Sequence, residues 1–171
     1  MSDDRPGLIW LTGYSGAGKT TVAEHVAASL RSDGRQVVTF DGDDLRAIFG
    51  GGWGYERRDR VELAHVYFRL CAHLVDEGAV VVISAVAMFD EVRDWVRANI
   101  RDARIVYLDV PHEVRLERDG RTKHVYSTAD VETLYDEPRR PDLRIANHGT
   151  TTPEEAARQI VALFGGGRVD G

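Results

Sequence analysis

The sequence predicts an α/β protein in which helices cover both faces of a mainly parallel, five-stranded sheet. The first observation behind this is that short β-branched or apolar runs alternate with amphipathic segments along most of the chain. The second is a glycine-rich stretch, residues 13–20, that lies between the first run and the first amphipathic segment. The third is the length of 171 residues, which suits one domain spanning residues 1–171.

Five runs are expected to form the strands: residues 8–12, 37–40, 80–84, 105–109 and 143–146. Helices are expected over residues 20–30, 57–77 and 112–119, and after the capping sequence Thr152-Pro153-Glu154-Glu155. In a sheet of this kind, ligands bind beyond the carboxyl ends of the strands. We therefore looked for functional residues directly after each run.

Composition limits the classes of partner. The formal net charge of −6 argues against an extended nucleic-acid surface, so an anionic substrate has to be met by a local group of arginines. The chain has one cysteine, Cys71, which we interpret as a core thiol in a reducing compartment. A polar N-terminus and the lack of any apolar run of bilayer length predict a cytoplasmic protein without a membrane partner.

The stretch from Gly13 to Thr20 fits the pattern G-x-x-x-x-G-K-[ST]. In this pattern backbone N–H groups surround phosphate oxygens, the lysine neutralises the β/γ charge, and the threonine hydroxyl ligates Mg²⁺. The expected ATP-binding residues are Gly13, Ser15, Gly16, Ala17, Gly18, Lys19, Thr20 and Thr21. A glycine turn without a ligand is the alternative interpretation.

Three carboxylates follow the second run, in Asp41-Gly42-Asp43-Asp44. Carboxylates beside a γ-phosphate hold the water shell of a metal or accept the proton of the acceptor hydroxyl. The alternative is that Asp43 or Asp44 only caps a helix. The third run ends at Ser84 without the metal-binding aspartate that usually stands there, which favours a functional role for this acidic cluster.

Two further segments each allow two interpretations. Residues 48–55 are rich in glycine and aromatic side chains, which either stack on a flat substrate ring or anchor the loop to the core. Arg57, Arg58 and Arg60 begin the long helix, where the helix dipole disfavours cations, so they either contact an anion or are simply solvated.

Residues 120–141 are polar and poorly periodic, which is typical of a lid that excludes water during transfer or of a disordered segment without function. Residues 165–171 are expected to form a flexible tail. The histidines show no metal-ligand spacing.

Taken in order, these pieces resemble the adenylyl-sulfate kinase family of P-loop kinases. The matching residues are 13–21, 41–46, Gly54-Tyr55 with Asp59-Arg60, Ser84 with Phe89 and Arg93, and 109–111, 117–119, 135–138 and 141–143. The resemblance implies a three-layer P-loop kinase fold, a dependence on ATP and Mg²⁺, and transfer of the γ-phosphate to a hydroxyl of a small anionic metabolite. Dimers are common in that family, so the resemblance also implies a homodimer, although no stripe in the sequence specifies an interface.

The resemblance also implies individual roles. Lys19, Asp41 and Asp43 are the expected catalytic residues, and Thr20 with Asp43 would hold the metal. The acceptor side is implied to include Asp43, Arg46, Tyr55, Arg60, Ser84 and Phe89. Arg118 corresponds to a family residue near the adenine of ATP.

This chain departs from the family pattern on the acceptor side. Polar family positions are replaced in Glu62-Leu63-Ala64-His65-Val66 and in Val86-Ala87-Met88, and residues 121–126 stand where the family has a basic lid sequence. The acceptor is thus adenylyl sulfate or another alcohol, such as cytidine diphosphoramidate or a specialised metabolite. A nucleotide-binding regulatory module without acceptor chemistry is the alternative from a different class.

Overall fold

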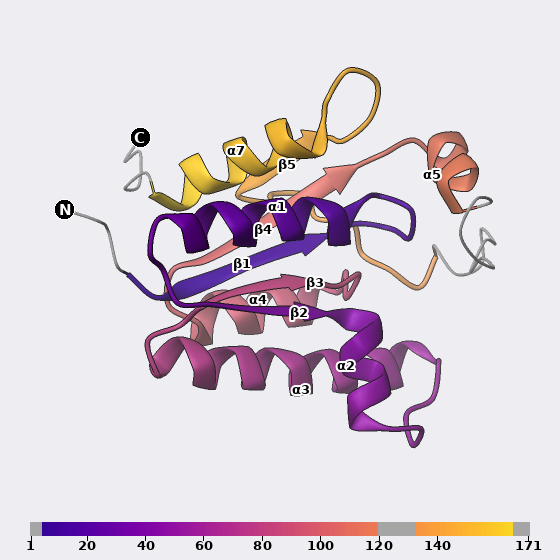
Figure 1. Cartoon of the computed structure of the whole chain (residues 1–171). Coiled ribbons are helices and arrows are strands. Elements are labelled where there is room, and N and C mark those ends of the chain that lie inside the picture. The colour runs from indigo at the N-terminus through magenta and orange to yellow at the C-terminus, as the bar shows by residue number, and fades with distance from the viewer. Residues whose placement is uncertain (1–4, 120–132, 166–171) are drawn as a thin grey trace.

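The computed structural model describes residues 5–119 and 133–165 (Figure 1). Its strands are β1 (Gly7–Thr12), β2 (Val37–Asp41), β3 (Val80–Ser84), β4 (Ala103–Asp109) and β5 (Leu143–Ala146). Its helices are α1 (Lys19–Ser32), α2 (Gly42–Phe49), α3 (Arg57–Asp76), α4 (Asp90–Asn99), α5 (His112–Asp119) and α7 (Pro153–Gly165). All five expected strands are present, and two of them, β3 and β5, have the expected bounds.

The strands form one parallel sheet in the order β2-β3-β1-β4-β5. Their carboxyl ends therefore lie along one edge, the side on which α2 and α5 stand in Figure 1. The chain crosses over between β1 and its two neighbours, so β1 lies at the centre of the sheet and delivers residues 13–20 to the middle of that edge.

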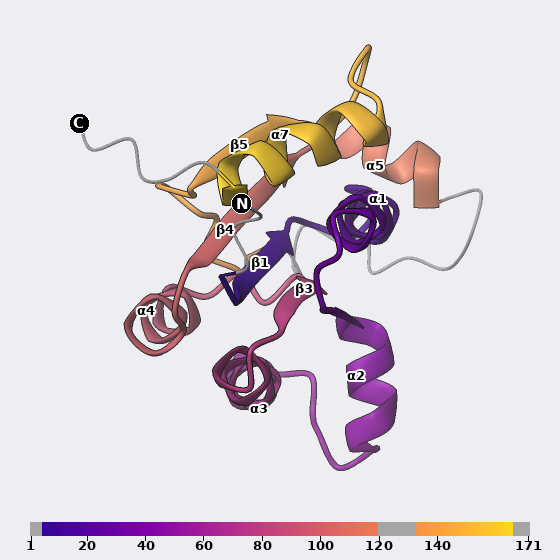
Figure 2. The ribbon, with the colours of Figure 1, turned by 60° about the vertical axis from the view of Figure 1, so that its left-hand side comes forward.

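Two cores fill the space between the sheet and its helices. Alternate residues of β1 point to opposite faces, so Leu8 and Trp10 join one core while Ile9 and Leu11 join the other. The first core is closed by α3 and α4, where the Trp10 ring lies 4.4 Å from the ring of Phe68. The second core is closed by α1 and α7, which share the opposite face (Figure 2). This arrangement confirms the expected three layers.

Helix α2 begins with a side-chain cap from the end of β2. Asp41 accepts a hydrogen bond at 2.9 Å from the backbone N–H of Asp43, which satisfies one of the free donors of the first turn. The helix cap considered for Asp43 or Asp44 is therefore made by Asp41 instead.

The capping sequence before α7 behaves as expected, because the Thr152 hydroxyl accepts from the N–H of Glu155 at 3.2 Å. Residues 120–132 of the expected lid and residues 166–171 of the expected tail lie outside the described residues. Within the described part of the chain, no helix has both the length and the hydropathy that a bilayer crossing requires.

Candidate active site

Residues 13–20, the phosphate loop, are held in a conformation that needs glycine. Gly16 and Gly18 have φ angles of 78° and 85°, in the left-handed region that L side chains rarely adopt. An added Cβ at Gly16 would lie 2.8 Å from the backbone oxygen of Arg115, and one at Gly18 would lie 2.8 Å from Nδ2 of Asn147. The loop is therefore shaped both by its own backbone and by the segments packed against it.

Two side chains fasten the outer side of the phosphate loop. Asn147, only 4% exposed, donates from Nδ2 to the carbonyl of Ala17 at 2.8 Å. Arg118 donates to the carbonyl of Gly16 at 3.3 Å and to the carbonyl of Asn147 at 2.8 Å. The structure thus places Arg118 against the loop, while Asn147 was missed from the sequence although it directly follows a strand at the functional edge of the sheet.

Helix α1 starts inside the phosphate loop at Lys19. The loop's last residues therefore sit at a helix N-terminus, where N–H groups and the helix dipole favour anions. The Lys19 ammonium donates to the carbonyl of Tyr14 at 2.9 Å, which keeps it folded over the loop. Three residues in or directly after the loop are exposed: Ser15, Thr20 and Thr21.

Asp41 receives hydrogen bonds from three segments. Its Oδ2 accepts from the Thr20 hydroxyl at 2.7 Å and from the Ser84 hydroxyl at 2.8 Å, while Oδ1 accepts from the N–H of Asp43. Burial is the largest single influence and raises the pKa of Asp41, but the hydrogen bonds together with the charge of Lys19 bring the pKa below its ordinary value. Asp41 is therefore an anion at neutral pH.

The Thr20 hydroxyl and the Asp41 carboxylate fit a magnesium site. They offer neighbouring hard oxygen ligands beside a phosphate-binding loop, and Mg²⁺ is usually held by one or two such groups with water and substrate phosphates. Among the described residues, no group of three or more His, Cys, Asp or Glu side chains forms a metal site of its own. Asp43 lies next to this pair with an exposed side chain in the first turn of α2.

Arg46, in α2, packs against the loop of residues 50–55 that follows this helix. It donates to the carbonyls of Trp53 and Gly54 at 2.9 and 2.8 Å, and its guanidinium carbon lies 4.2 Å from the centre of the Tyr55 ring. Trp53 packs on the core, whereas Tyr55 is 58% exposed. Each interpretation of this loop therefore describes a different residue: Trp53 anchors the loop to the core, and the Tyr55 side chain is exposed.

Arg60 lies within reach of two tyrosines. It donates to the backbone oxygen of Tyr55 at 2.7 Å and to the hydroxyl of Tyr135 at 3.0 Å. The Tyr135 ring lies 5.4 Å from the ring of Phe89, which is 1% exposed. Phe89 therefore supports Tyr135 from below, and we call Arg46, Tyr55, Arg60 and Tyr135 the acceptor cluster.

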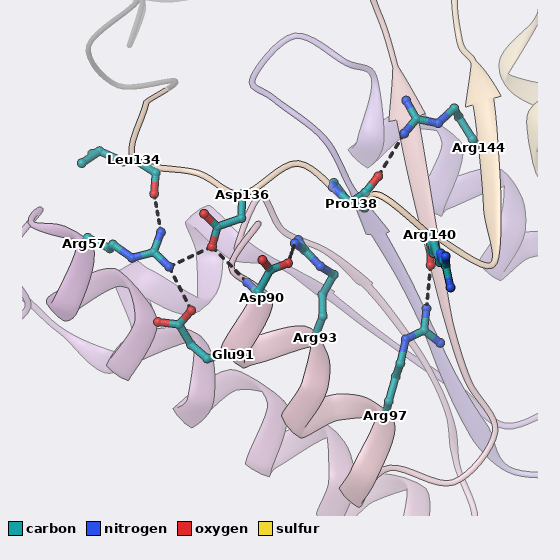
Figure 3. Close-up of polar contacts among 10 residues, drawn as sticks. All are labelled: Arg57, Asp90, Glu91, Arg93, Arg97, Leu134, Asp136, Pro138, Arg140 and Arg144. Atoms are coloured by element: carbon teal, nitrogen blue, oxygen red, sulfur yellow. Dashed lines mark hydrogen bonds and ion pairs between the residues drawn. The ribbon is translucent and has the colours of Figure 1, made fainter.

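Arg57, at the start of α3, contacts anions of the protein itself. Its guanidinium pairs with Asp136 at 2.8 Å and with Glu91 at 2.9 Å, and it donates to the carbonyl of Leu134 at 2.8 Å (Figure 3). Arg58 forms an exposed pair with Glu62 one turn along the helix. The anion contact considered for this helix start is thus an internal one at Arg57.

Some departures from the family pattern lie inside the core. Leu63 and Ala64 are each 2% exposed, and Met88 is fully buried. At these positions, apolar side chains of the interior therefore stand where the family pattern has polar ones. The departure at residues 121–126 lies outside the described residues.

Comparison with known proteins agrees with this geometry. The sequence model of the family described as adenylylsulphate kinase matches residues 5–146. The chain belongs to the adenylylsulphate kinase family. It is an ATP-dependent phosphotransferase of the adenylyl-sulfate kinase type.

Individual relatives share nearly the whole chain. A probable adenylyl-sulfate kinase from Pyrococcus abyssi is 31% identical over 162 residues, covering 90% of this chain and 91% of the relative. A cytidine diphosphoramidate kinase from Campylobacter jejuni is 28% identical over 165 residues, covering 92% of this chain and 96% of the relative. The structure of the Mycobacterium tuberculosis adenylyl-sulfate (APS) kinase in complex with AMPPNP and APS superposes with a TM-score of 0.80, at 28% identity and with 93% and 97% of the two chains covered. The predicted fold and kinase class are confirmed, and the relatives carry two different acceptor names.

Proposed function

We propose that this kinase transfers the γ-phosphate of Mg²⁺-bound ATP to a hydroxyl of a small, anionic, nucleotide-linked acceptor. The observation that carries this proposal is the position of two groups at the same edge of the sheet. One is the phosphate loop with the hydrogen-bonded pair Thr20 and Asp41, and the other is the acceptor cluster of two arginines and two tyrosines. Phosphoryl transfer needs both reactants held in line, so such a pairing of sites is what the reaction requires.

On the donor side, the loop amides and Lys19 would bind the triphosphate, and Thr20 with Asp41 would hold Mg²⁺. Bound there, Mg²⁺ would supply positive charge that offsets the charge of the ATP phosphates during transfer. Asp41 is already ionised and oriented by the hydroxyls of Thr20 and Ser84. We assign the exposed carboxylate of Asp43, in the first turn of α2, to the acceptor hydroxyl or to the water shell of the metal.

On the acceptor side, Arg46 and Arg60 would bind the anionic group. Both guanidinium carbons lie within 6 Å of the Tyr55 ring, at 4.2 and 5.6 Å. An exposed aromatic ring flanked by two cations suits a ligand that combines a flat ring with negative charge. Ser84 contributes through Asp41, and Phe89 contributes by supporting Tyr135.

Two compounds are the leading candidates for the acceptor. Adenylyl sulfate is favoured by the family match over residues 5–146, and cytidine diphosphoramidate by the Campylobacter relative, which covers 92% of this chain. Both are nucleotide-linked anions, so the cluster described above suits either one.

A coupled ADP-release assay with Mg²⁺ and ATP tests the proposal. We expect ADP release to rise when adenylyl sulfate or cytidine diphosphoramidate is added, and not with free adenosine or cytidine, which lack the anion. ATP hydrolysis that stays slow with every acceptor would contradict the proposal and favour a nucleotide-binding regulatory module.

Two neighbouring carboxylates offer a matched pair for the assigned roles. Asp41→Asn should raise the Mg²⁺ concentration needed for half-maximal activity, because one ligand loses its charge. Asp43→Asn should lower kcat far more than it weakens ATP binding. Titrations of Mg²⁺ and ATP against both variants measure this, and the reverse pattern would exchange the two assignments.

The proposed function also includes the domain organisation, the compartment and the assembly of the enzyme. The chain acts as one kinase domain. The enzyme works in the cytoplasm, where its single thiol, buried Cys71 with a pKa raised by burial to about 12, stays reduced. The proposed assembly is a homodimer. Size-exclusion chromatography with light scattering tests this.

A further inference from the structure

Tyr135 links the two halves of the site. Its hydroxyl accepts a hydrogen bond from Arg60 of the acceptor cluster at 3.0 Å. Its ring meets the ring of Tyr14, in the phosphate loop, edge-on at a centroid distance of 6.1 Å. Its ring also lies 5.4 Å from the buried ring of Phe89. One side chain therefore touches the proposed acceptor site, the donor loop and the core.

The backbone on both sides of Tyr135 is fastened to Arg57. The guanidinium donates to the carbonyl of Leu134 at 2.8 Å and to the carboxylate of Asp136 at 2.8 Å (Figure 3). The same guanidinium lies 4.9 Å from the centre of the Phe89 ring. We call these contacts of Arg57 with residues 134 and 136 the Arg57 clamp.

Asp136 adds two bonds that fix its own position. Its backbone N–H donates to the carbonyl of Met88 at 2.7 Å, and its Oδ2 accepts from the backbone N–H of Asp90 at 3.1 Å. It thereby caps the N-terminus of α4, where Phe89 provides no side-chain cap of its own. A residue bound in this way to two elements leaves its neighbour Tyr135 little freedom in the direction of its ring.

We propose that Tyr135 is a specificity-determining residue of the acceptor site, and that Arg57 and Asp136 are positioning residues that hold its ring in place. This inference rests on the proposed function. Arg60 has its guanidinium carbon 5.6 Å from the Tyr55 ring and 5.9 Å from the Tyr135 ring. A flat ring attached to an anion would meet the tyrosines with its ring and Arg60 with its charge. The contact with Tyr14 then sets the acceptor's distance from the phosphate loop.

The chain contains a matched control for the Arg57 clamp. Arg97 of α4 binds the far end of the same segment, donating to the carbonyl of Arg140 at 3.2 Å (Figure 3). It also pairs with the carboxylate of Asp142 at 3.2 Å. It has the same design, one guanidinium joined to a carboxylate and a carbonyl. No aromatic residue of the acceptor cluster lies between its two attachment points.

The test compares acceptor and ATP kinetics across these variants. Tyr135→Leu should raise the KM for the acceptor by about tenfold or more, the scale of one lost aromatic stacking contact, with the KM for ATP changed by less than about twofold. Tyr135→Phe, which keeps the ring but loses the hydroxyl, should give a smaller rise. Arg57→Lys and Asp136→Asn should raise the acceptor KM in the same direction, whereas Arg97→Lys should leave both KM values unchanged.

The probes are adenylyl sulfate and cytidine diphosphoramidate, each with saturating Mg²⁺ and ATP, and each variant is also melted to record its Tm. If Tyr135→Leu keeps the wild-type acceptor KM while the wild type turns over either probe, the inference is wrong and the proposed function stands. If the Arg57 and Arg97 variants change both KM values alike, the clamp is only structural. If the wild type turns over neither probe, the proposed function fails and the inference falls with it. Tyr135→Phe keeps the test decisive should Tyr135→Leu fail to fold.

Discussion

The phosphate loop and the acceptor cluster are built in different ways. The loop is one continuous stretch of eight residues, 13–20, and what it offers to phosphate is mainly backbone N–H groups at the start of α1. The acceptor cluster is gathered from α2, the following loop, α3 and the segment before β5, and it offers only side chains. Arg60 and Tyr135, which share a hydrogen bond, are 75 residues apart in the chain.

The difference explains why one half of the site is easier to alter than the other. Substitution changes side chains but leaves backbone amides in place, so a loop that binds through amides keeps its ligand while its surroundings change. A cluster of side chains can be rebuilt one residue at a time. This agrees with relatives of similar identity that carry the names of kinases for two different acceptors.

The largest effect should come from the one side-chain charge on which the loop depends. Lys19→Ala should lower kcat by at least about 10³-fold, because nothing else in the loop neutralises the γ-phosphate. The fold should persist, because Lys19→Ala removes no side chain from either hydrophobic core and alanine favours the helix that begins here. ADP-release kinetics and a circular dichroism melt measure the two quantities. Activity close to wild type would show that the donor half does not work as a phosphate loop.

The next largest effect is expected at Gly16. It tests whether the segments packed against the phosphate loop set the shape of that loop. Gly16→Ala should lower kcat/KM for ATP by about 10²-fold, because its new Cβ would press on the backbone oxygen of Arg115 and displace the loop. Gly34→Ala is the matched control, with a φ of 83° and open space around it. Both should lose about 1–2 kcal/mol of stability to left-handed strain, but only Gly16→Ala should lose activity. Equal activities in the two variants would mean that the loop tolerates movement.

In the acceptor half, two arginines of the first turn of α3 can be compared. Arg60→Ala should raise the acceptor KM by about 10- to 100-fold, as expected for loss of a charge-assisted contact, and should leave the KM for ATP unchanged. Arg58→Ala should change neither value, because in the described part of the chain Arg58 forms an exposed surface pair with Glu62 and lies outside the acceptor cluster. A matching rise in both variants would indicate general charge attraction without a defined site.

The smallest effect concerns the pH dependence of the Arg57 clamp. The hydrogen bond from Arg57 is the main cause that lowers the pKa of Asp136 below its ordinary value of 3.8. A carboxylate with a lowered pKa stabilises the fold above its unfolded pKa and loses this contribution as the pH falls through the folded pKa. Asp136→Asn should therefore be less stable than wild type by about 1 kcal/mol at pH 5 to 7. Urea unfolding should show this gap narrowing below about pH 4, and a gap that is constant with pH would contradict an ionised clamp.

Patterns among neighbouring residues were enough to predict the strands and the phosphate loop. Strand β3 ends at Ser84 and β5 spans residues 143–146 as expected, and residues 13–20 lie at the predicted turn between β1 and α1. These features depend on neighbours in sequence, through side-chain alternation in strands and glycine conformations in the loop. The resemblance to the kinase family added the proposed roles of the acceptor-side residues, which periodicity alone does not provide.

The sequence by itself thus determined the α/β class, the phosphate loop and the edge of the sheet where chemistry takes place, since each follows from short-range pattern. Only the tertiary structure decided which partners meet there. In it, Asn147 donates to the carbonyl of Ala17, Asp136 caps α4 by accepting from the N–H of Asp90, and the Tyr135 hydroxyl accepts from Arg60. Each of these contacts joins residues more than forty positions apart, and no local preference encodes such pairs, because they form only when the sheet order brings distant loops to one edge.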